Sequence, residues 1–146
     1  MVKIVIGADH GGFALKEEIK RFLSKYYEVE DVGASKLDSD DDYVDYAEKV
    51  ARKVSKEDSL GILLCRSAAG MVIAANKIKG VRAAAAFDIK SAVHSREHND
   101  ANVLAVSGDW LSAKDACDIV KAWIETKFSN DQRHVRRLEK IKRLEQ

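Results

Sequence analysis

Apolar and polar residues follow one another along the chain in two alternating patterns. Short, continuously apolar runs indicate strands buried on both faces, whereas apolar residues three and four apart indicate helices with one buried face. The first pattern predicts strands at 2–8, 29–32, 60–65, 81–87 and 103–106. Four consecutive alanines weaken the fourth of these predictions, because Ala is a poor strand former.

Helical spacing follows every predicted strand. The first, second and fifth helices have the clearest buried faces, formed by Leu15, Ile19, Phe22, Leu23 and Tyr26; by Ala47, Val50, Ala51 and Val54; and by Ala113, Ala116, Cys117, Val120, Trp123 and Ile124. An Ala-rich helix should end near Gly80, and a further helix should cover about 88–98. Asp131 is a candidate cap for a last helix with a narrow apolar stripe. The polar, Asp-rich segment 33–43 predicts a loop.

The alternation of strands and helices predicts one doubly wound α/β domain. Such a pattern gives a parallel sheet covered by helices on both faces, with right-handed crossovers. A chain of 146 residues suits a single core, and neither an internal repeat nor a low-complexity segment divides residues 1–146. The sequence has no proline, so its turns depend on Gly, Asn, Asp and Ser.

Charge and cysteine content narrow the function classes. The 25 Lys and Arg residues nearly balance the 24 Asp and Glu residues, which argues against nucleic-acid or membrane binding by the whole surface. No apolar run approaches the ~18 residues of a membrane span, and the first residues lack the pattern of a secretory signal. Cys65 and Cys117 do not suggest a disulfide framework, and no Cys/His spacing suggests a zinc site. We therefore expect the reducing cytoplasm.

The segment Asp9-His10-Gly11-Gly12 directly follows the first predicted strand and opens a helix. In open parallel sheets, ligands bind beyond the carboxyl ends of the strands. An acid, an imidazole and two glycines at a positive helix terminus suit a polar or anionic small ligand. A capping Asp beside a solvent-facing His would explain half of the pattern. The segment is not a G-x-G-x-x-G fingerprint, so it does not indicate a dinucleotide.

A second candidate segment, residues 65–70, follows the third predicted strand. A thiol at a strand tip, just before a helix N-terminus, lies where its thiolate is electrostatically favoured. The N–H groups that follow Cys65 could hold a developing oxyanion. Position alone leaves open a second interpretation, in which Cys65 is a small buried hydrophobe. Cys117 lies in the apolar stripe of a long helix, and we interpret it as core packing.

Two further clusters contain His98 with Asn99, and Arg133 with Arg137. The arginines are four apart on one helix face and can converge on a phosphate, although a solvated basic terminus is the preferred interpretation of the arginines alone. Both clusters fall at the sheet edge opposite the strand tips, roughly 15–20 Å away within one chain. If all these groups form one site, a second subunit must complete it, so we hypothesise a symmetric dimer with two shared sites.

Together these residues resemble the type B ribose-5-phosphate isomerase family, which also contains galactose-6-phosphate isomerase subunits. The resemblance runs from Lys3 to about Ile141. Its marks are Gly7-Ala8-Asp9-His10-Gly11-Gly12, Asp42-Tyr43, Cys65 with its loop, Ile73-Ala74-Ala75-Asn76-Lys77, Gly80-Val81-Arg82-Ala83, residues 95–104, and Arg133-His134 with Arg137. Any one of these marks is weak, whereas the ordered set at matching separations is specific.

The resemblance implies a Rossmann-like three-layer sandwich with a five-stranded parallel sheet, and a homodimer without nucleic-acid or membrane partners. It implies aldose–ketose isomerisation of a phosphorylated sugar, with ribose 5-phosphate and ribulose 5-phosphate as the expected pair, through an enediolate and without cofactor or metal. By position, Cys65 matches the base, Ser67 an anion-holding loop residue, His98 the ring-opening group and Asp9 a group near the ring oxygen. The further expected substrate-binding residues are His10, Tyr43, Arg66, Ala68, Ala69, Gly70, Asn99, Arg133, His134 and Arg137. The helix at about 131–144 is expected to reach toward the partner subunit.

The chain departs from the family pattern in the Cys65 loop and after the fifth strand. The loop is usually Cys-Gly-Thr/Ser-Gly-x-Gly, and the loss of glycines here limits positive φ. Asp109, followed by Trp110, stands where the family commonly has an Arg, and Val44 replaces the usual Pro. Arg66 either supplies the missing cation or faces solvent or pairs with Asp109. A tetrose or hexose phosphate substrate, or a catalytically weakened sugar-phosphate-binding protein, is therefore an alternative. A nucleic-acid module built on the basic tail lacks an aromatic platform.

Overall fold

Five parallel strands form the centre of the molecule. The computed structural model describes residues 2–145 and orders the strands β2-β1-β3-β5-β4 across one sheet. Their bounds are Lys3–Ala8 for β1, Glu28–Asp31 for β2, Ser59–Cys65 for β3, Ala83–Ala85 for β4 and Val103–Ser107 for β5. All four strand pairings are parallel, which confirms the fold class expected from the alternation of strands and helices.

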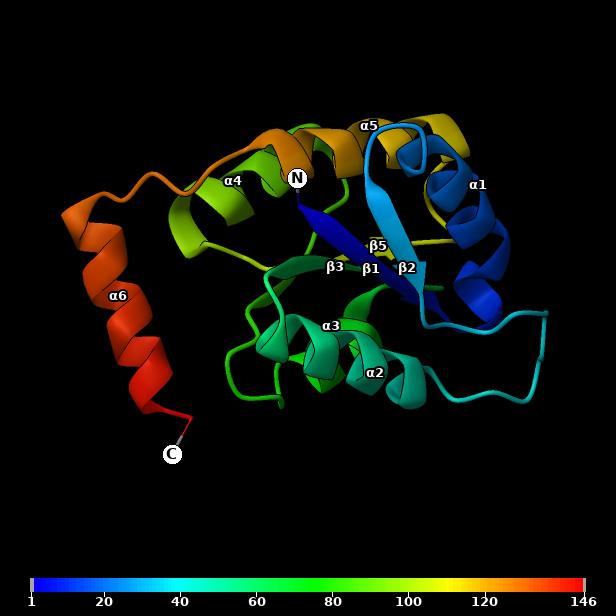
Figure 1. Cartoon of the computed structure of the whole chain (residues 1–146), viewed down its shortest axis with the longest axis horizontal. Coiled ribbons are helices and arrows are strands. Elements are labelled where there is room, and N and C mark those ends of the chain that lie inside the picture. The colour runs from blue at the N-terminus through cyan, green and yellow to red at the C-terminus, as the bar shows by residue number, and fades with distance from the viewer. Residues whose placement is uncertain (1, 146) are drawn as a thin grey trace.

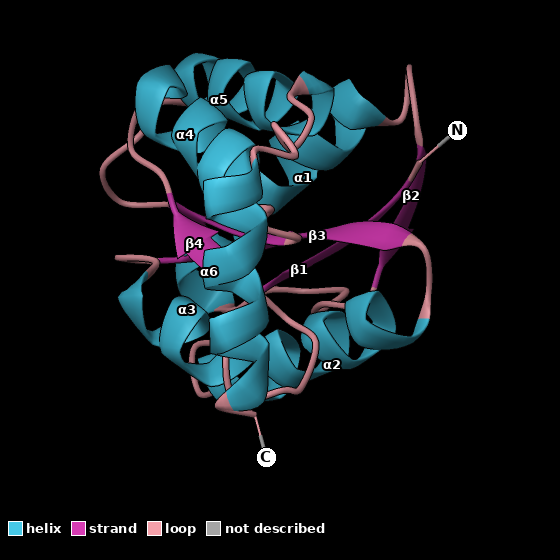
Figure 2. Ribbon diagram, turned by 90° about the vertical axis from the view of Figure 1, so that its left-hand side faces the viewer, coloured by secondary structure: helices cyan, strands magenta, loops and turns pink. Residues whose placement is uncertain are grey.

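Helices cover both faces of this sheet, as Figure 2 shows. The bounds are His10–Gly12 for the 3₁₀ turn η1, Phe13–Leu23 for α1, Tyr43–Lys56 for α2, Ala69–Ala75 for α3, Ile89–Asn99 for α4, Ala113–Glu125 for α5 and Gln132–Arg143 for α6. Helices α1, α4 and α5 form one layer and α2 and α3 the other, whereas α6 stands across one end of the sheet. No helix in the described part of the chain is long and apolar enough to cross a membrane.

Two apolar clusters, one on each face of the sheet, hold the layers together. Side chains of β1, β3 and β5 that alternate along each strand pack against α1 and α5 on one face and against α2 and α3 on the other. Trp123 of α5 is fully buried in the first cluster, and Met71 of α3 in the second. Cys117 is half-buried and packs against the first cluster, which confirms its interpretation as a packing residue.

The structure corrects the bounds of three predicted elements. Helix α1 ends at Leu23, so Tyr26 lies outside it and is 61% exposed. Helix α3 ends at Ala75 and not near Gly80, because the Asn76 side chain exchanges two hydrogen bonds with the backbone of Ala83 and draws the chain toward β4. Strand β4 is limited to three residues at the edge of the sheet, where alanine-rich sequence has only β5 as a neighbour.

The register of the strands determines which loops meet. Cys65, the last residue of β3, pairs with Ser107 of β5, and Ala8 of β1 pairs with Leu64. The loops after β1, β3 and β5 therefore lie together at the carboxyl edge of the sheet. Figure 1 shows the arrowheads of β1 and β2 pointing away from α6, which lies at the opposite end.

Candidate functional site

The Cys65 thiol lies at the tip of β3 and is almost inaccessible, with the residue 5% exposed. The N–H of Ala68 donates a hydrogen bond to Sγ over 3.1 Å. Burial raises the pKa of Cys65 above its ordinary value of 9.0, and Asp9 adds to the rise, whereas the N–H groups of Ala68, Met71 and Ser67 lower it. The loop N–H groups that were expected to favour the thiolate are present, and burial opposes their effect.

The loop after Cys65 has Arg66 and Ala68 at two positions where glycine was expected, and it keeps Gly70. Ala68 has φ +73°, a left-handed conformation that costs a non-glycine residue about 1–2 kcal/mol. Ala68 is also fully buried. The strain places its N–H on the Cys65 sulfur, so one of the donors expected to hold a substrate oxyanion is already engaged in the free protein. The loop therefore adopts a positive φ at residue 68 although that residue is alanine.

Tyr43 also belongs to this edge, since it begins α2 and packs against the same loop. A Cβ added to Gly70 would lie 2.6 Å from the Tyr43 ring, so the ring fits only because residue 70 has no side chain. Ser67 and Ala69 lie between these contacts, Ser67 partly exposed and Ala69 exposed at the first turn of α3. The predicted residues of the carboxyl edge are thus brought together by α2, α3 and the tip of β3.

Asp9 and His10 follow β1 and meet a third group that the sequence did not single out. Asp9 accepts the N–H of Gly11 over 3.0 Å, and burial raises its pKa. The Asp41 carboxylate accepts the backbone N–H of His10 and lies 2.7 Å from His10 Nδ1. This hydrogen bond raises the pKa of His10. The Asp-rich composition of the 33–43 loop was the only signal in the sequence, and it does not identify which Asp turns inward.

Asp9, His10 and Asp41 are also the group that has the spacing of metal ligands within residues 2–145. Most of their inward-facing atoms already have hydrogen-bond partners: Asp9 Oδ1 binds a backbone N–H, and His10 Nδ1 binds Asp41 Oδ1. Only Asp41 Oδ2 is buried without one. The arrangement is explained as a hydrogen-bonded support for the His10 ring.

Arg66 and Asp109 meet through the backbone and not through their charges. The Asp109 N–H donates to the Arg66 carbonyl oxygen over 3.3 Å, and the Ser107 hydroxyl donates to the same oxygen. Among the described residues, no carboxylate lies within ion-pair distance of the exposed Arg66 guanidinium. Pairing of Arg66 with Asp109, one of the interpretations left open above, is therefore wrong.

A second cluster lies at the opposite end of the sheet, where α4 and α6 meet. The His98 ring lies between two other imidazoles, with its centroid 4.0 Å from that of His94 and 4.3 Å from that of His134. Burial and the neighbouring imidazoles lower the pKa of His98. His134 is 6% exposed, and its Nδ1 lies 3.0 Å from the Ser129 hydroxyl, so it lies behind His98 rather than at the surface. Sequence reasoning missed His94, which the i, i+4 spacing on α4 could have revealed.

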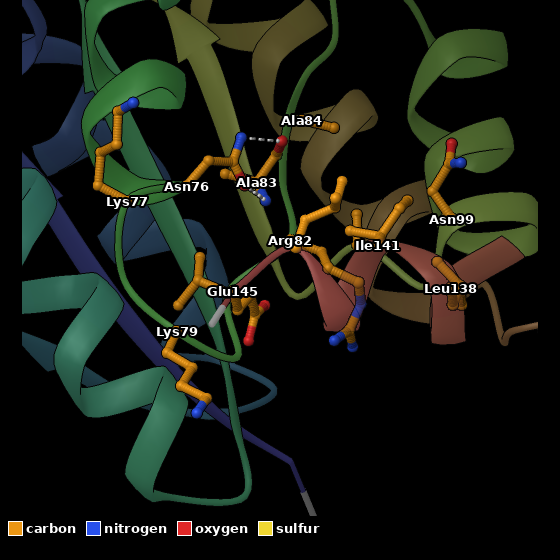
Figure 3. Close-up of a pocket in the computed structure, with 13 residues that line it drawn as sticks. Asn76, Lys77, Lys79, Arg82, Ala83, Ala84, Asn99, Leu138, Ile141 and Glu145 are labelled. Atoms are coloured by element: carbon orange, nitrogen blue, oxygen red, sulfur yellow. Dashed lines mark hydrogen bonds between the residues drawn. The ribbon is translucent and has the colours of Figure 1, made fainter.

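Arg133, Arg137 and Asn99 are exposed at the same end. Asp131 caps α6 through the N–H of Arg133, as expected. Between α6 and the edge strand β4 lies an open cavity of about 670 Å³, lined by Leu138 and Ile141 of α6, by Asn99 and by the segment around Arg82 (Figure 3). Strand β5 alone, four residue steps long, separates this end from the Cys65 edge by about 13 Å. The chain thus contains two groups of predicted site residues that do not meet within it.

Known proteins match this chain along nearly its whole length. A family model described as ribose/galactose isomerase covers residues 4–141. Ribose-5-phosphate isomerase B of Mycobacterium tuberculosis is 39% identical over 140 residues, which are 94% of this chain and 86% of that protein. The crystal structure of ribose-5-phosphate isomerase B from Mycoplasma genitalium with bound ribulose 5-phosphate superposes with a TM-score of 0.94 at 40% identity, covering 99% of this chain and 96% of that one. The enzyme of Clostridium thermocellum gives 0.94 at 45% identity, with 99% and 97% covered. The chain belongs to the ribose/galactose isomerase family.

Proposed function

We propose that the protein interconverts ribose 5-phosphate and ribulose 5-phosphate, with Cys65 as the base. The observation that carries this proposal is the buried thiol at the carboxyl edge, within a loop of N–H donors and near the Asp9 carboxyl group. Family membership and the solved relative with bound ribulose 5-phosphate support the same reaction class. Sugar-phosphate isomerisation needs a base, groups that stabilise the oxyanion and groups that bind the phosphate, and this chain has candidate residues for each role.

The reaction relocates two protons on the open-chain sugar, one from C2 to C1 and one from O2 to O1. The Cys65 thiolate removes the proton from C2, and the electrons move into the C1 carbonyl to give an enediolate. Preorganised N–H groups of the loop, with Ser67, stabilise the developing negative charge. The thiol then returns the proton to C1 while the O2 hydroxyl proton passes to O1, which leaves the carbonyl at C2 and a hydroxyl group at C1. Atoms and electrons balance without an added redox partner. Asp9 and His98 act before these steps, when the furanose ring opens.

Two chains are needed to assemble that site. His98, Asn99, Arg133 and Arg137 lie at the edge opposite Cys65, so in this proposal they serve the site of the partner subunit. Neutral His98, with its lowered pKa, suits proton exchange at the sugar ring. The two exposed arginines, four apart on α6, suit a phosphate.

Exposed apolar surface supports a dimer on the β4 side of the sheet. Phe87 and Trp110 follow β4 and β5 at the carboxyl edge, have ring centroids 5.7 Å apart and are 46% and 65% exposed. The cavity between β4 and α6 opens at the other end of the same strands. A two-fold axis beside β4 would set the carboxyl edge of each copy against the α4–α6 end of the other. Both patches would then be covered, and α6 would reach the partner.

A substrate panel tests the activity. We expect turnover of ribose 5-phosphate in a coupled assay and its loss, by a factor of about 10²–10⁴, in Cys65→Ala. Cys117→Ala is the matched control, because that half-buried cysteine lies on α5 away from the site. Preferred turnover of a four- or six-carbon phosphate would move the assignment to that substrate. Binding without turnover of any of them would favour a sugar-phosphate-binding protein.

Mixing two inactive variants tests the shared site. Cys65→Ala and His98→Ala chains, unfolded and refolded together, form mixed dimers in which one site contains both intact residues. Random pairing then restores about a quarter of wild-type activity. Each variant refolded alone stays inactive. If the mixture also stays inactive although both chains refold and exchange, each site belongs to one chain and the shared-site proposal is wrong.

The cytoplasm remains the expected compartment, because both cysteines are free.

A further inference from the structure

The backbone of Arg66 is fixed on two sides at the carboxyl edge. Its carbonyl oxygen accepts hydrogen bonds from the Ser107 hydroxyl and from the N–H of Asp109. The carbonyl of Cys65 accepts the N–H of Gly108 over 2.7 Å. Hydrogen bonds therefore join the loops after β3 and β5 at Arg66, and they fix the position of its backbone.

The absence of a side chain at Gly11 makes room for the Arg66 side chain. A Cβ at Gly11 would lie 2.4 Å from Arg66 Cγ and 3.1 Å from Arg66 N, and real Cβ atoms essentially never approach within 3.0 Å. The Arg66 side chain thus packs directly over the η1 turn that contains His10. Only a glycine at position 11 leaves room for this contact.

The charge of Arg66 acts on His10. Its positive charge opposes the rise in the pKa of His10 that the Asp41 hydrogen bond causes. The pKa of Cys65, by contrast, responds chiefly to burial and to the N–H groups of its own loop. Arg66 therefore lies beside the η1 turn that contains His10, and among residues 2–145 it has no carboxylate at ion-pair distance.

Arg66 and His10 thus bring two donors to the η1 turn, and of the two only His10 has a carboxylate at ion-pair distance among residues 2–145. Asp41 binds Nδ1 of His10, which leaves Nε2 as the free ring nitrogen. The planar guanidinium of an arginine presents paired donors that match phosphate oxygens. We propose that Arg66 and His10 of one protomer together bind the substrate phosphate, so that Arg66 selects phosphorylated over neutral sugars. This inference rests on the proposed function, because phosphate is the anion that such a substrate carries.

Arg66→Ala and Arg66→Lys test this role, with Arg52→Ala as the matched control. Arg52 is an exposed arginine on α2 that pairs with Glu48. Steady-state turnover of ribose 5-phosphate is measured together with calorimetric binding of inorganic phosphate and of unphosphorylated ribose. We expect Arg66→Ala to raise KM and the Kd of phosphate by about 10- to 100-fold. We expect kcat and the binding of ribose to change by less than about twofold. Arg66→Lys should restore part of the loss, since it keeps the charge without the fork.

Gly11→Ala provides an independent perturbation of the same contact. It should raise the Kd of phosphate in the wild-type background by displacing Arg66, and add little in the Arg66→Ala background, where no Cγ remains to clash. An unchanged Kd and KM in Arg66→Ala would overturn the inference, as would a loss confined to kcat. If the wild type isomerises no sugar phosphate, the proposed function fails. The phosphate Kd then still decides the role of Arg66.

Discussion

The ionisation of Cys65 gives the sharpest test of the proposed base. Burial holds its pKa above the ordinary value of 9.0, so at pH 7 no more than about 1% of the thiol is ionised in the free protein. Forming the thiolate at that pH costs at least about 2.7 kcal/mol, two pH units at 1.36 kcal/mol each. Between pH 7 and 8 the ionised fraction grows about tenfold, because the proton equilibrium is still far from its midpoint.

The test therefore varies the pH of a protein in which Cys65 is the single thiol. In a Cys117→Ser variant, the ultraviolet absorbance of the thiolate is recorded against pH, and a Cys65→Ser Cys117→Ser double variant supplies the baseline. We expect one titration with a midpoint above 9. The value of kcat/KM, which reports the free enzyme, should rise from pH 7 toward that midpoint.

A midpoint below 9.0 would refute this reasoning, since it would mean that the loop N–H groups outweigh desolvation. A kcat/KM that is constant from pH 7 to 8 while the thiol titrates above 9 would refute the assignment of Cys65 as the base. The thiol midpoint and the pH dependence of kcat/KM are independent results, because the absorbance is measured without substrate and the kinetics do not depend on the absorbance of the thiolate.

Two further predictions concern stability. Asp31→Asn should lower the free energy of unfolding by about 3 kcal/mol, because it removes the carboxylate 2.8 Å from fully buried Lys16, whereas Glu48→Gln, at an exposed ion pair, should cost less than about 0.5 kcal/mol. Folding lowers the pKa of Asp31, so its carboxylate contributes to stability above pH 3.8, and this contribution is lost as the pH falls through the folded-state pKa. The acid denaturation curves of the wild type and Asp31→Asn should therefore converge only below the folded-state pKa. Ala68→Gly should be nearly neutral in urea unfolding, because relief of about 1–2 kcal/mol of left-handed strain offsets one lost methyl and a freer unfolded chain. Ala47→Gly, a fully buried alanine within α2, should cost about 2 kcal/mol, and equal losses at the two positions would show that Ala68 is unstrained.

The spacing of apolar residues predicted the helices and strands of this fold, because the buried face of each element appears in its own short stretch of sequence. The strand tips, the carboxyl-edge position of Cys65 and the Asp131 cap follow from patterns of a few residues. The contact of Asp41 with His10 could not be predicted, since it joins residues 31 positions apart through a loop with no regular structure. The early end of α3 likewise depends on the Asn76 side chain finding the Ala83 backbone across a turn.

Topology explains why a chain of this size divides its chemistry between two edges. In a parallel sheet every strand tip points the same way, so Cys65 and Asp9 converge without any special loop. The residues that follow a helix on its return, such as His98 and Arg133, fall at the other edge for the same reason. Bringing them to Cys65 within one chain would need a long crossing loop, with its ordering entropy. The proposed two-fold partner would bring the second edge to the first through the exposed rings of Phe87 and Trp110 and the cavity beside α6. The phosphate contact proposed for Arg66 lies on the Cys65 side of that division, so its loss should weaken binding without weakening the dimer.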